Sequence, residues 1–234
     1  MGALYGVTIG DKHSYEDLGL YLESKTISSP MPQTKRVSVP ARNGSIDMSE
    51  VVTGHPTYQD RTIDMVFYSP KQIDDWPAEI SFIRNQLAGQ HLKICFDDDP
   101  AFYWLGRIES VAQDIDNPVE HIHITAIVDP YKYAINSSDE DWLWDPFDFE
   151  QGIVNELYDM EVDGSLEVQI IGQRKYVNPI IISSAAMTVE YEGQTYPVRA
   201  GSQIMYDIVL TKEVDTLIFH GTGTVSINYV GGSL

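Results

Sequence analysis

The sequence has very little cysteine, few basic residues and no long apolar run. Cys95 is the single cysteine, so the chain can form neither an intramolecular disulfide nor a thiolate metal cluster. Only 15 Lys and Arg oppose 35 Asp and Glu, and the formal net charge of −20 repels nucleic-acid phosphates and anionic membrane surfaces. No segment approaches the roughly 18 apolar residues of a membrane span. These absences favour a soluble protein whose partners are other proteins.

Targeting signals are also missing from the first ten residues, MGALYGVTIG. They contain neither the basic region nor the apolar region of a signal peptide. Tyr5-Gly6 does not fit the Ser or Thr that N-myristoylation requires after Met-Gly. We therefore expect synthesis in the cytoplasm.

No pattern of catalytic or cofactor-binding residues can be recognised. The chain lacks a Gly-x-Ser-x-Gly elbow and the glycine spacings of Walker and Rossmann loops. His121 and His123 would share one strand face, but a zinc site needs a third ligand that this face does not offer. Asp97, Asp98 and Asp99 precede Pro100 and lack the ligand spacing of a calcium loop, so they predict a turn. We expect no enzymatic activity, no cofactor and no metal site.

The first half of the chain alternates apolar and polar residues, which is typical of β-strands. Strands are predicted at 17–24, 61–69, 91–96, 102–111 and 121–128, with Cys95 as a buried strand residue. One segment differs: Trp76, Ile80, Ile83 and Leu87 recur at helical spacing before Gly89. The first half is therefore predicted to be β-rich with one amphipathic helix of about 13 residues.

The second half predicts an antiparallel β-sandwich. Seven short strand patterns are separated by Gly, Asn, Pro and Asp, at 165–171, 178–183, 186–193, 194–200, 203–210, 214–221 and 224–230. EYEGQTY predicts a hairpin across Glu192-Gly193. An acidic, aromatic stretch precedes them and contains Trp142, Trp144, Phe147 and Phe149. We place domains at 1–135 and 149–234, with a linker at 136–148. The net charge is −8 over 1–135 (11 basic, 19 acidic) and −12 over 136–234 (4 basic, 16 acidic).

The segment VSVPARNGSID, residues 37–47, combines a proline, an arginine and an Asn-Gly pair. It is consistent with an ordinary hairpin, a grip for an anion, or a loop that docks on another subunit. An anion grip normally uses a helix N-terminus, which this segment lacks. We favour a rigid turn that presents Arg42 to acidic residues across a subunit boundary. The predicted interface residues are Val39, Pro40, Arg42, Asn43, Gly44, Asp47 and Arg61.

The order of these motifs resembles the distal tail proteins of siphophages and prophages, the long non-contractile tailed phages. VSVPARNGSIDMS matches the loop of that family, and it lies between Leu18-Gly19-Leu20 and the strand that Arg61 opens. The helix, FDDDPAFYWLGRI, ITAIVDPYKY and the terminal INYVGGSL follow in the family's order. One departure is Ala41, where the family usually has Gly after the proline. Because Ala avoids positive φ, we expect Asn43-Gly44 to supply the unusual dihedral angles instead.

The resemblance implies a structural protein of the virion, located at the tail tip. Its N-terminal domain would assemble into a hexameric hub ring, single or double, whose lumen lets DNA pass. The ring would join the tail-tube protein to the tail-tip (tail-associated) protein and in some phages to a receptor-binding protein. The galectin-like or carbohydrate-module-like sandwich would project outward. Two alternatives remain: the sandwich binds host glycans through aromatic residues such as Trp142 and Trp144, or the protein is a cell-wall hydrolase.

Overall fold

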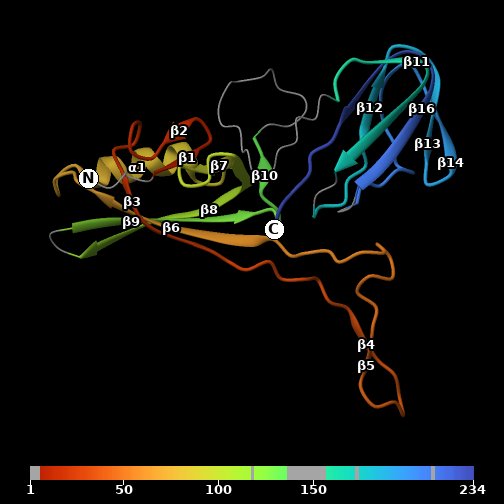
Figure 1. Ribbon diagram of the computed structural model, residues 1–234. Coiled ribbons are helices and arrows are strands. Elements are labelled where there is room, and N and C mark those ends of the chain that lie inside the picture. Colours follow the sequence, from red (N-terminus) through yellow and green to blue (C-terminus); the bar gives the residue numbers. More distant parts are fainter. Residues whose placement is uncertain (1–5, 117–118, 136–156, 172–173, 212–213) are drawn as a thin grey trace. The chain divides into compact units, whose positions relative to one another are not determined.

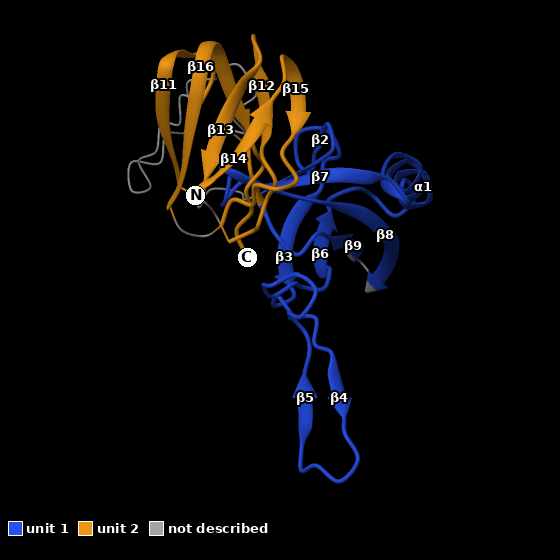
Figure 2. Ribbon diagram, turned by 90° about the vertical axis from the view of Figure 1, so that its right-hand side faces the viewer, with its two compact units in different colours: residues 1–132 blue, residues 133–234 orange. Residues whose placement is uncertain are grey.

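The structure is a computed structural model that describes residues 6–116, 119–135, 157–171, 174–211 and 214–234 (Figure 1). The chain forms two compact units, residues 1–132 and 133–234 (Figure 2), and each is described by itself. Both are built almost entirely from antiparallel strands, which confirms the predicted mainly β fold. The predicted linker, residues 136–148, and Phe149 directly after it lie outside the described residues.

Unit 1 contains nine strands and one helix, and unit 2 contains seven strands among the described residues. In unit 1 the elements are β1 Val7–Ile9, β2 Lys12–His13, β3 Tyr21–Ile27, β4 Arg36–Ser38, β5 Ser45–Asp47, β6 Arg61–Ser69, α1 Trp76–Leu87, β7 His91–Phe96, β8 Phe102–Asp116 and β9 Val119–Val128. In unit 2 they are β10 Tyr133–Ala134, β11 Met160–Ile171, β12 Ile180–Ser183, β13 Met187–Tyr191, β14 Gln194–Val198, β15 Gly201–Ile204 and β16 Val214–Asn228.

The main sheet of unit 1 has the strand order β2-β1-β7-β8-β9-β6-β3. Its strands alternate between a buried and a solvated face, because successive side chains of a strand point to opposite sides. Ile63, Met65 and Phe67 of β6 are buried as the alternation predicted. Ile122, Ile124 and six other strand residues bury the same face: Val7, Ile9, Ile94, Ile108, Ala126 and Val128. The core of unit 1 therefore lies on one side of this sheet.

Helix α1 covers that apolar face of the sheet (Figure 1). Trp76, Ile80, Ile83 and Leu87 are all buried, as their spacing predicted. Pro77 sits in the first turn, where the missing N–H costs nothing. Gly89 has φ +74° just beyond the helix, so it supplies the left-handed residue that ends it.

The sheet of unit 2 folds over its own inner face. β12 and β13 both pair with β16. Ser183 of β12 lies opposite Val225, and Thr188, five residues later, lies opposite His220, five residues earlier on β16, so both strands share one register. They are thus two parts of one long strand. Its buried apolar side chains lie on one face, as do those of β16, and a single core cluster joins them. Both ends of β11 and β16 contribute to this cluster, with less buried residues between them, so the sheet encloses one core, as in the predicted sandwich.

Three predicted details differ from the structure. Residues 214–221 and 224–230 were expected as two strands, but β16 runs through Gly221 and Gly223, whose missing side chains leave room for Met187 and Ser184. A strand was expected at 203–210, but the strand in this region is β15, Gly201–Ile204. Cys95 is half-buried and not part of the core, because β7 turns it away from the core face.

Candidate functional site

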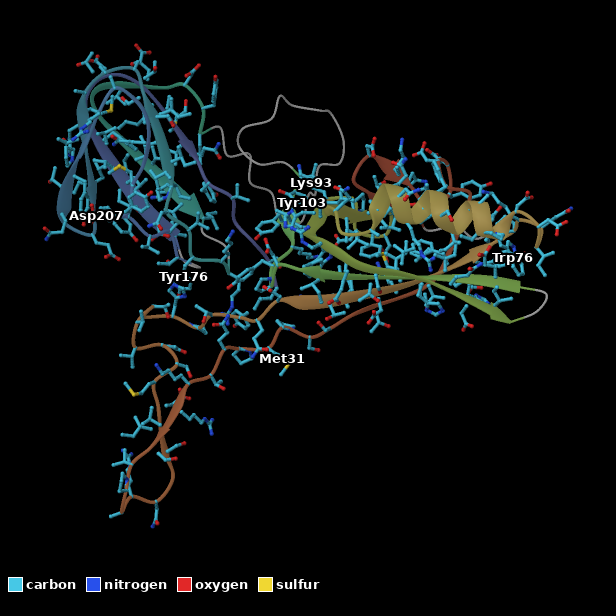
Figure 3. The ribbon with its side chains drawn as sticks, turned by 180° about the vertical axis from the view of Figure 1, so that it is seen from behind. Met31, Trp76, Lys93, Tyr103, Tyr176 and Asp207 are labelled. Atoms are coloured by element: carbon cyan, nitrogen blue, oxygen red, sulfur yellow. The ribbon has the colours of Figure 1, made fainter. Side chains whose placement is uncertain are left out.

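An arm, residues 31–58, projects from unit 1 between β3 and β6 (Figures 1 and 2). Its ends are held by hydrogen bonds from the Gln59 N–H to the Met31 carbonyl, 2.9 Å, and from the Gln33 N–H to the Thr57 carbonyl, 2.8 Å. Farther out, β4 and β5 form a two-stranded ribbon in which Val37 pairs with Ile46. Figure 3 shows Met31 at the root of the arm. Six of the seven predicted interface residues lie on this arm.

The turn at the tip of the arm corrects the prediction for Ala41. Ala41 has φ +63°, whereas Asn43 is absent from the residues with positive φ. The Arg42 N–H donates to the Val39 carbonyl at 3.2 Å, so Val39–Arg42 is a turn with proline second and positive φ third. That is the pattern of a type II turn, whose third position favours glycine. Pro40 supplies the fixed φ of the second position, and Ala41 adopts a costly conformation at the third. Gly44, φ +77°, reverses the chain as expected.

Asp47 is held by contacts within the arm. Its carboxylate accepts hydrogen bonds from the Ser49 N–H at 3.0 Å and from the Ser49 hydroxyl. Arg36 lies 3.9 Å away on the paired strand, and the Ser49 hydroxyl oxygen accepts the Lys35 N–H at 2.8 Å. The hydrogen bonds from Ser49 lower the pKa of Asp47, since they favour the ionised carboxylate. The carboxylate of Asp47 therefore stiffens the ribbon.

Arg61 lies at the base of the arm, where β6 begins, and it is buried. Its Nε donates to the Ser28 carbonyl at 2.7 Å, and its guanidinium lies 4.6 Å from the centre of the Trp104 ring. Burial lowers the pKa of Arg61. These contacts are all within unit 1, and they join the start of the arm to the sheet.

The ribbon exposes an unusual amount of apolar surface. Every residue of β4 and β5 is exposed to solvent. Val51 and Val52 are 68% and 95% exposed, and five more apolar residues of the arm are also exposed: Met31, Val37, Val39, Ile46 and Met48. An isolated two-stranded ribbon is only marginally stable in water. This surface is therefore suited to contact with another molecule.

The arm also differs from the rest of the chain in charge. Residues 31–58 contain three basic residues, Lys35, Arg36 and Arg42, and two acidic ones, Asp47 and Glu50, for a net charge of +1. The remaining residues contain 12 basic and 33 acidic side chains, a net charge of −21. Opposite charge favours the approach of an arm to the body of another copy.

Each aspartate of the predicted turn at 97–99 is paired with a cationic or polar group. The Asp97 carboxylate accepts the Gly6 N–H at 2.7 Å and lies 3.2 Å from His13 Nε2. Asp98 pairs with Lys25, and Asp99 lies 2.6 Å from Lys132 Nζ. The turn thus ties distant segments of unit 1 to the end of β7. These partners cannot be found from a local sequence pattern, since they lie up to 91 residues away.

The two neighbouring histidines do not form a metal cluster in the part of the chain that the structure describes. His121 Nδ1 lies 2.8 Å from the Glu23 carboxylate, and His121 and His123 share one face of β9 as predicted. Among the described residues no group of three His, Cys, Asp or Glu side chains is arranged to hold a metal.

Unit 2 has a polar cavity of about 450 Å³, lined by Tyr176, Tyr191, Glu192, Thr211, Val214, Asp215 and Thr216. The Tyr191 hydroxyl lies 2.7 Å from the Val209 carbonyl oxygen and 3.0 Å from the Asp215 carboxylate, and these two acceptors share its one proton. Burial and the neighbouring Asp215 carboxylate raise the pKa of Tyr191. Asp215 also accepts the Thr211 N–H at 2.7 Å. Because the Tyr191 ring is buried, it offers no open face on which a sugar could stack.

The described helix is too short to cross a membrane. Comparison with solved structures finds the crystal structure of SPP1 Dit, described as a paradigm of the hub adsorption apparatus in phages that infect Gram-positive bacteria. The match has a TM-score of 0.65 and 13% sequence identity, and it covers 98% of this chain and 99% of Dit. This chain has the fold of Dit. The resemblance to distal tail proteins is therefore supported at the level of the fold. No family model and no curated protein matches the sequence.

Proposed function

We propose that this protein is a structural hub of a siphophage tail, without catalytic activity. Copies associate through the domain at residues 1–135 into a hexameric ring, single or double. The ring joins the tail-tube protein to the tail-tip protein, carries a receptor-binding protein in some arrangements, and lets DNA pass through its lumen. The domain at 149–234 projects outward. The chain-wide fold likeness to Dit supports a role of this class. In this proposal the protein is part of the virion.

The exposed arm is the observation that carries this proposal. Its apolar side chains and its net charge of +1 suit the acidic body of a second copy. In this arrangement each arm crosses to the neighbouring subunit, and Arg42 at its tip meets acidic side chains there. The ribbon is available for this contact because it is exposed and adds no residue to the core of its own unit.

A negatively charged lumen would let DNA slide without adhering. The formal charge of −20 per copy gives a ring with a strongly negative field. This inference concerns passage only, and no stable nucleic-acid binding is part of the proposal.

Assembly mass tests the proposal. At micromolar concentration, light scattering should give about six times the 26.3 kDa mass of the chain. Each Val37 or Ile46 side chain is already partly covered, so burying the remainder contributes about 1 kcal/mol. The double variant Val37→Ser, Ile46→Ser should therefore weaken each contact by tenfold or more. Arg42→Glu should weaken assembly in the same direction and leave the monomer folded.

Matched controls are Val214→Ser and Arg199→Glu, which alter an exposed valine and an exposed arginine of unit 2. Both should assemble like the wild-type chain. Arm variants that assemble as well as these controls would contradict the role of the arm. A chain that stays monomeric at all concentrations, alone and with its tail-tube partner, would contradict the ring.

A further inference from the structure

Two glutamates are buried together between helix α1 and the sheet of unit 1. Glu79 lies in the first turn of α1, and Glu120 lies near the start of β9. Their exposed fractions are 3% and 0%. Carboxylates are seldom fully buried, because removing the charge from water costs several kcal/mol unless it is compensated. The position of the pair therefore needs a specific explanation.

The surrounding groups compensate the charge of only one of the two carboxyl groups. Glu79 Oε2 accepts a hydrogen bond from the Ser69 hydroxyl at 2.7 Å, and Lys71 Nζ lies 3.2 Å from Glu79 Oε1. The Gln113 side-chain amide donates to Glu120 Oε1. Glu79 Oε1 and Glu120 Oε2 accept no hydrogen bond among the described residues. The ion pair with Lys71 reaches only Glu79, and Glu120 Oε2 faces no donor among the described residues.

Charge balance indicates one proton in this cluster. The groups that face Glu120 are Glu79 from α1, Lys71 from the segment after β6, and Gln113 from β8. Lys71 is the single cation among them and can neutralise one carboxylate. A second buried carboxylate would leave a net charge of −1 and two carboxylates side by side. A proton on Glu120 that is donated to the Glu79 carboxylate removes this charge and gives Glu120 Oε2 a partner.

We propose that Glu79 and Glu120 share one proton and form a buried clasp that holds the start of α1 on the sheet and opens as the pH rises. Glu79 is the ionised member, because Lys71 and the N-terminal end of the helix favour its negative charge. Glu120 carries the proton and donates it to Glu79. The hold of α1 on the sheet thus depends on pH.

The electrostatics of Glu120 agree with this arrangement. Burial raises the pKa of Glu120, the hydrogen bond from Gln113 lowers it, and the neighbouring Glu79 raises it further, for a net increase. A raised pKa in the folded state means that the folded protein binds the proton more tightly. The stabilisation is complete below the ordinary Glu pKa of about 4.3, and it is lost as the pH rises through the raised pKa of Glu120.

The proposal is tested with the full chain by hydrogen exchange of the α1 amides, corrected for intrinsic exchange rates. In the wild type, the protection of residues 80–87 should fall with rising pH, by up to about tenfold per pH unit for one proton. Glu120→Gln keeps the shape and donates an N–H to Glu79 at every pH. Protection should then stay constant across that range. Glu109→Gln, an exposed glutamate of β8, should behave like the wild type.

Glu79→Gln provides a second test that does not depend on the first variant folding well. It removes the neighbouring carboxylate, so the loss of protection should shift to lower pH or disappear. A wild-type pH profile in either variant would overturn the shared proton. So would a wild-type chain whose α1 protection does not change with pH.

Discussion

Gly106 lies where β8 comes closest to its neighbour β9. A Cβ atom at this position would lie 2.2 Å from the Ile127 carbonyl oxygen and 2.5 Å from Val128 Cα. Backbone atoms in the middle of a sheet cannot move aside as a flexible side chain can. Gly106→Ala should therefore destabilise unit 1 by about 3 kcal/mol, at the upper end of the range for overpacking. Urea unfolding monitored by circular dichroism would measure this loss.

Gly89→Ala is the matched control for this substitution. Nothing lies within 4 Å of a Cβ atom built at Gly89, and only its positive φ opposes alanine. Its cost should be about 1 kcal/mol, which is the penalty of a left-handed residue with a side chain. Equal losses in the two variants would contradict the steric explanation for Gly106.

The buried glutamates show where reading single residues from the sequence fails. Glu79 follows Trp76 by three residues and precedes Ile83 by four, so it borders the apolar face of the helix, but its charge predicts an exposed side chain. Glu120 faces away from the two histidines on β9, and its burial depends on Gln113 and Glu79. Such compensation is created by tertiary contacts and leaves no local pattern in the sequence.

At the scale of elements, the turn of the arm provides a direct test of strain. Ala41 has φ +63°, which costs about 1–2 kcal/mol for a residue with a side chain. Glycine removes this cost. It also makes the unfolded chain more flexible, which offsets about 0.5–1 kcal/mol of the gain. Ala41→Gly should therefore stabilise the ribbon by up to about 1 kcal/mol. Hydrogen exchange of the Arg42 amide, which donates to Val39, should slow by two- to fivefold.

Gly44→Ala should act in the opposite direction. Gly44 has φ +77° and open space around it, so the dihedral angle is the sole penalty. Exchange of the amides in residues 36–47 should become faster in this variant. Faster exchange of the Arg42 amide in Ala41→Gly would contradict the strain assigned to Ala41.

Elements with a strong period could be predicted closely from the sequence. The helix begins at Trp76 and ends at Leu87 because four apolar residues, Pro77 and Gly89 all favour the same boundaries. The hairpin at Glu192-Gly193 is also confirmed, with both residues at positive φ. In contrast, Gly221 and Gly223 look like breaks between strands, whereas in the folded sheet they allow β16 to pass close to Met187 and Ser184. A glycine that ends a strand and one that permits a close approach cannot be distinguished locally.

The sequence located the candidate site, but it did not predict that this part of the chain forms a projecting arm. The sequence indicated a turn at residues 37–47, and the structure confirms a hairpin there. The length of the arm depends on the pairing of Pro32 with Tyr58, 26 residues apart, which no short-range pattern reveals. Its role as a subunit interface stays a prediction.

At the scale of the whole molecule, the chain contains two core clusters that share no residue. Phe67 and Phe219 are each fully buried, the first in unit 1 and the second in unit 2. Replacing either with alanine removes a large side chain and leaves a cavity, which costs about 3–5 kcal/mol. Because each cavity borders one cluster, Phe67→Ala should reduce the hydrogen-exchange protection of residues 61–69 and leave that of 214–228 unchanged. Phe219→Ala should give the reverse.

The two variants serve as controls for each other, since they make the same substitution at equal burial. Two clusters that unfold separately should give two calorimetric transitions, of which each variant lowers one. The double variant should lower both by the amounts seen in the single variants, because distant sites contribute additively. If Phe67→Ala instead reduces protection in β16 as much as in β6, the chain unfolds as one cooperative unit. The energetic division of the molecule would then differ from the division of its cores.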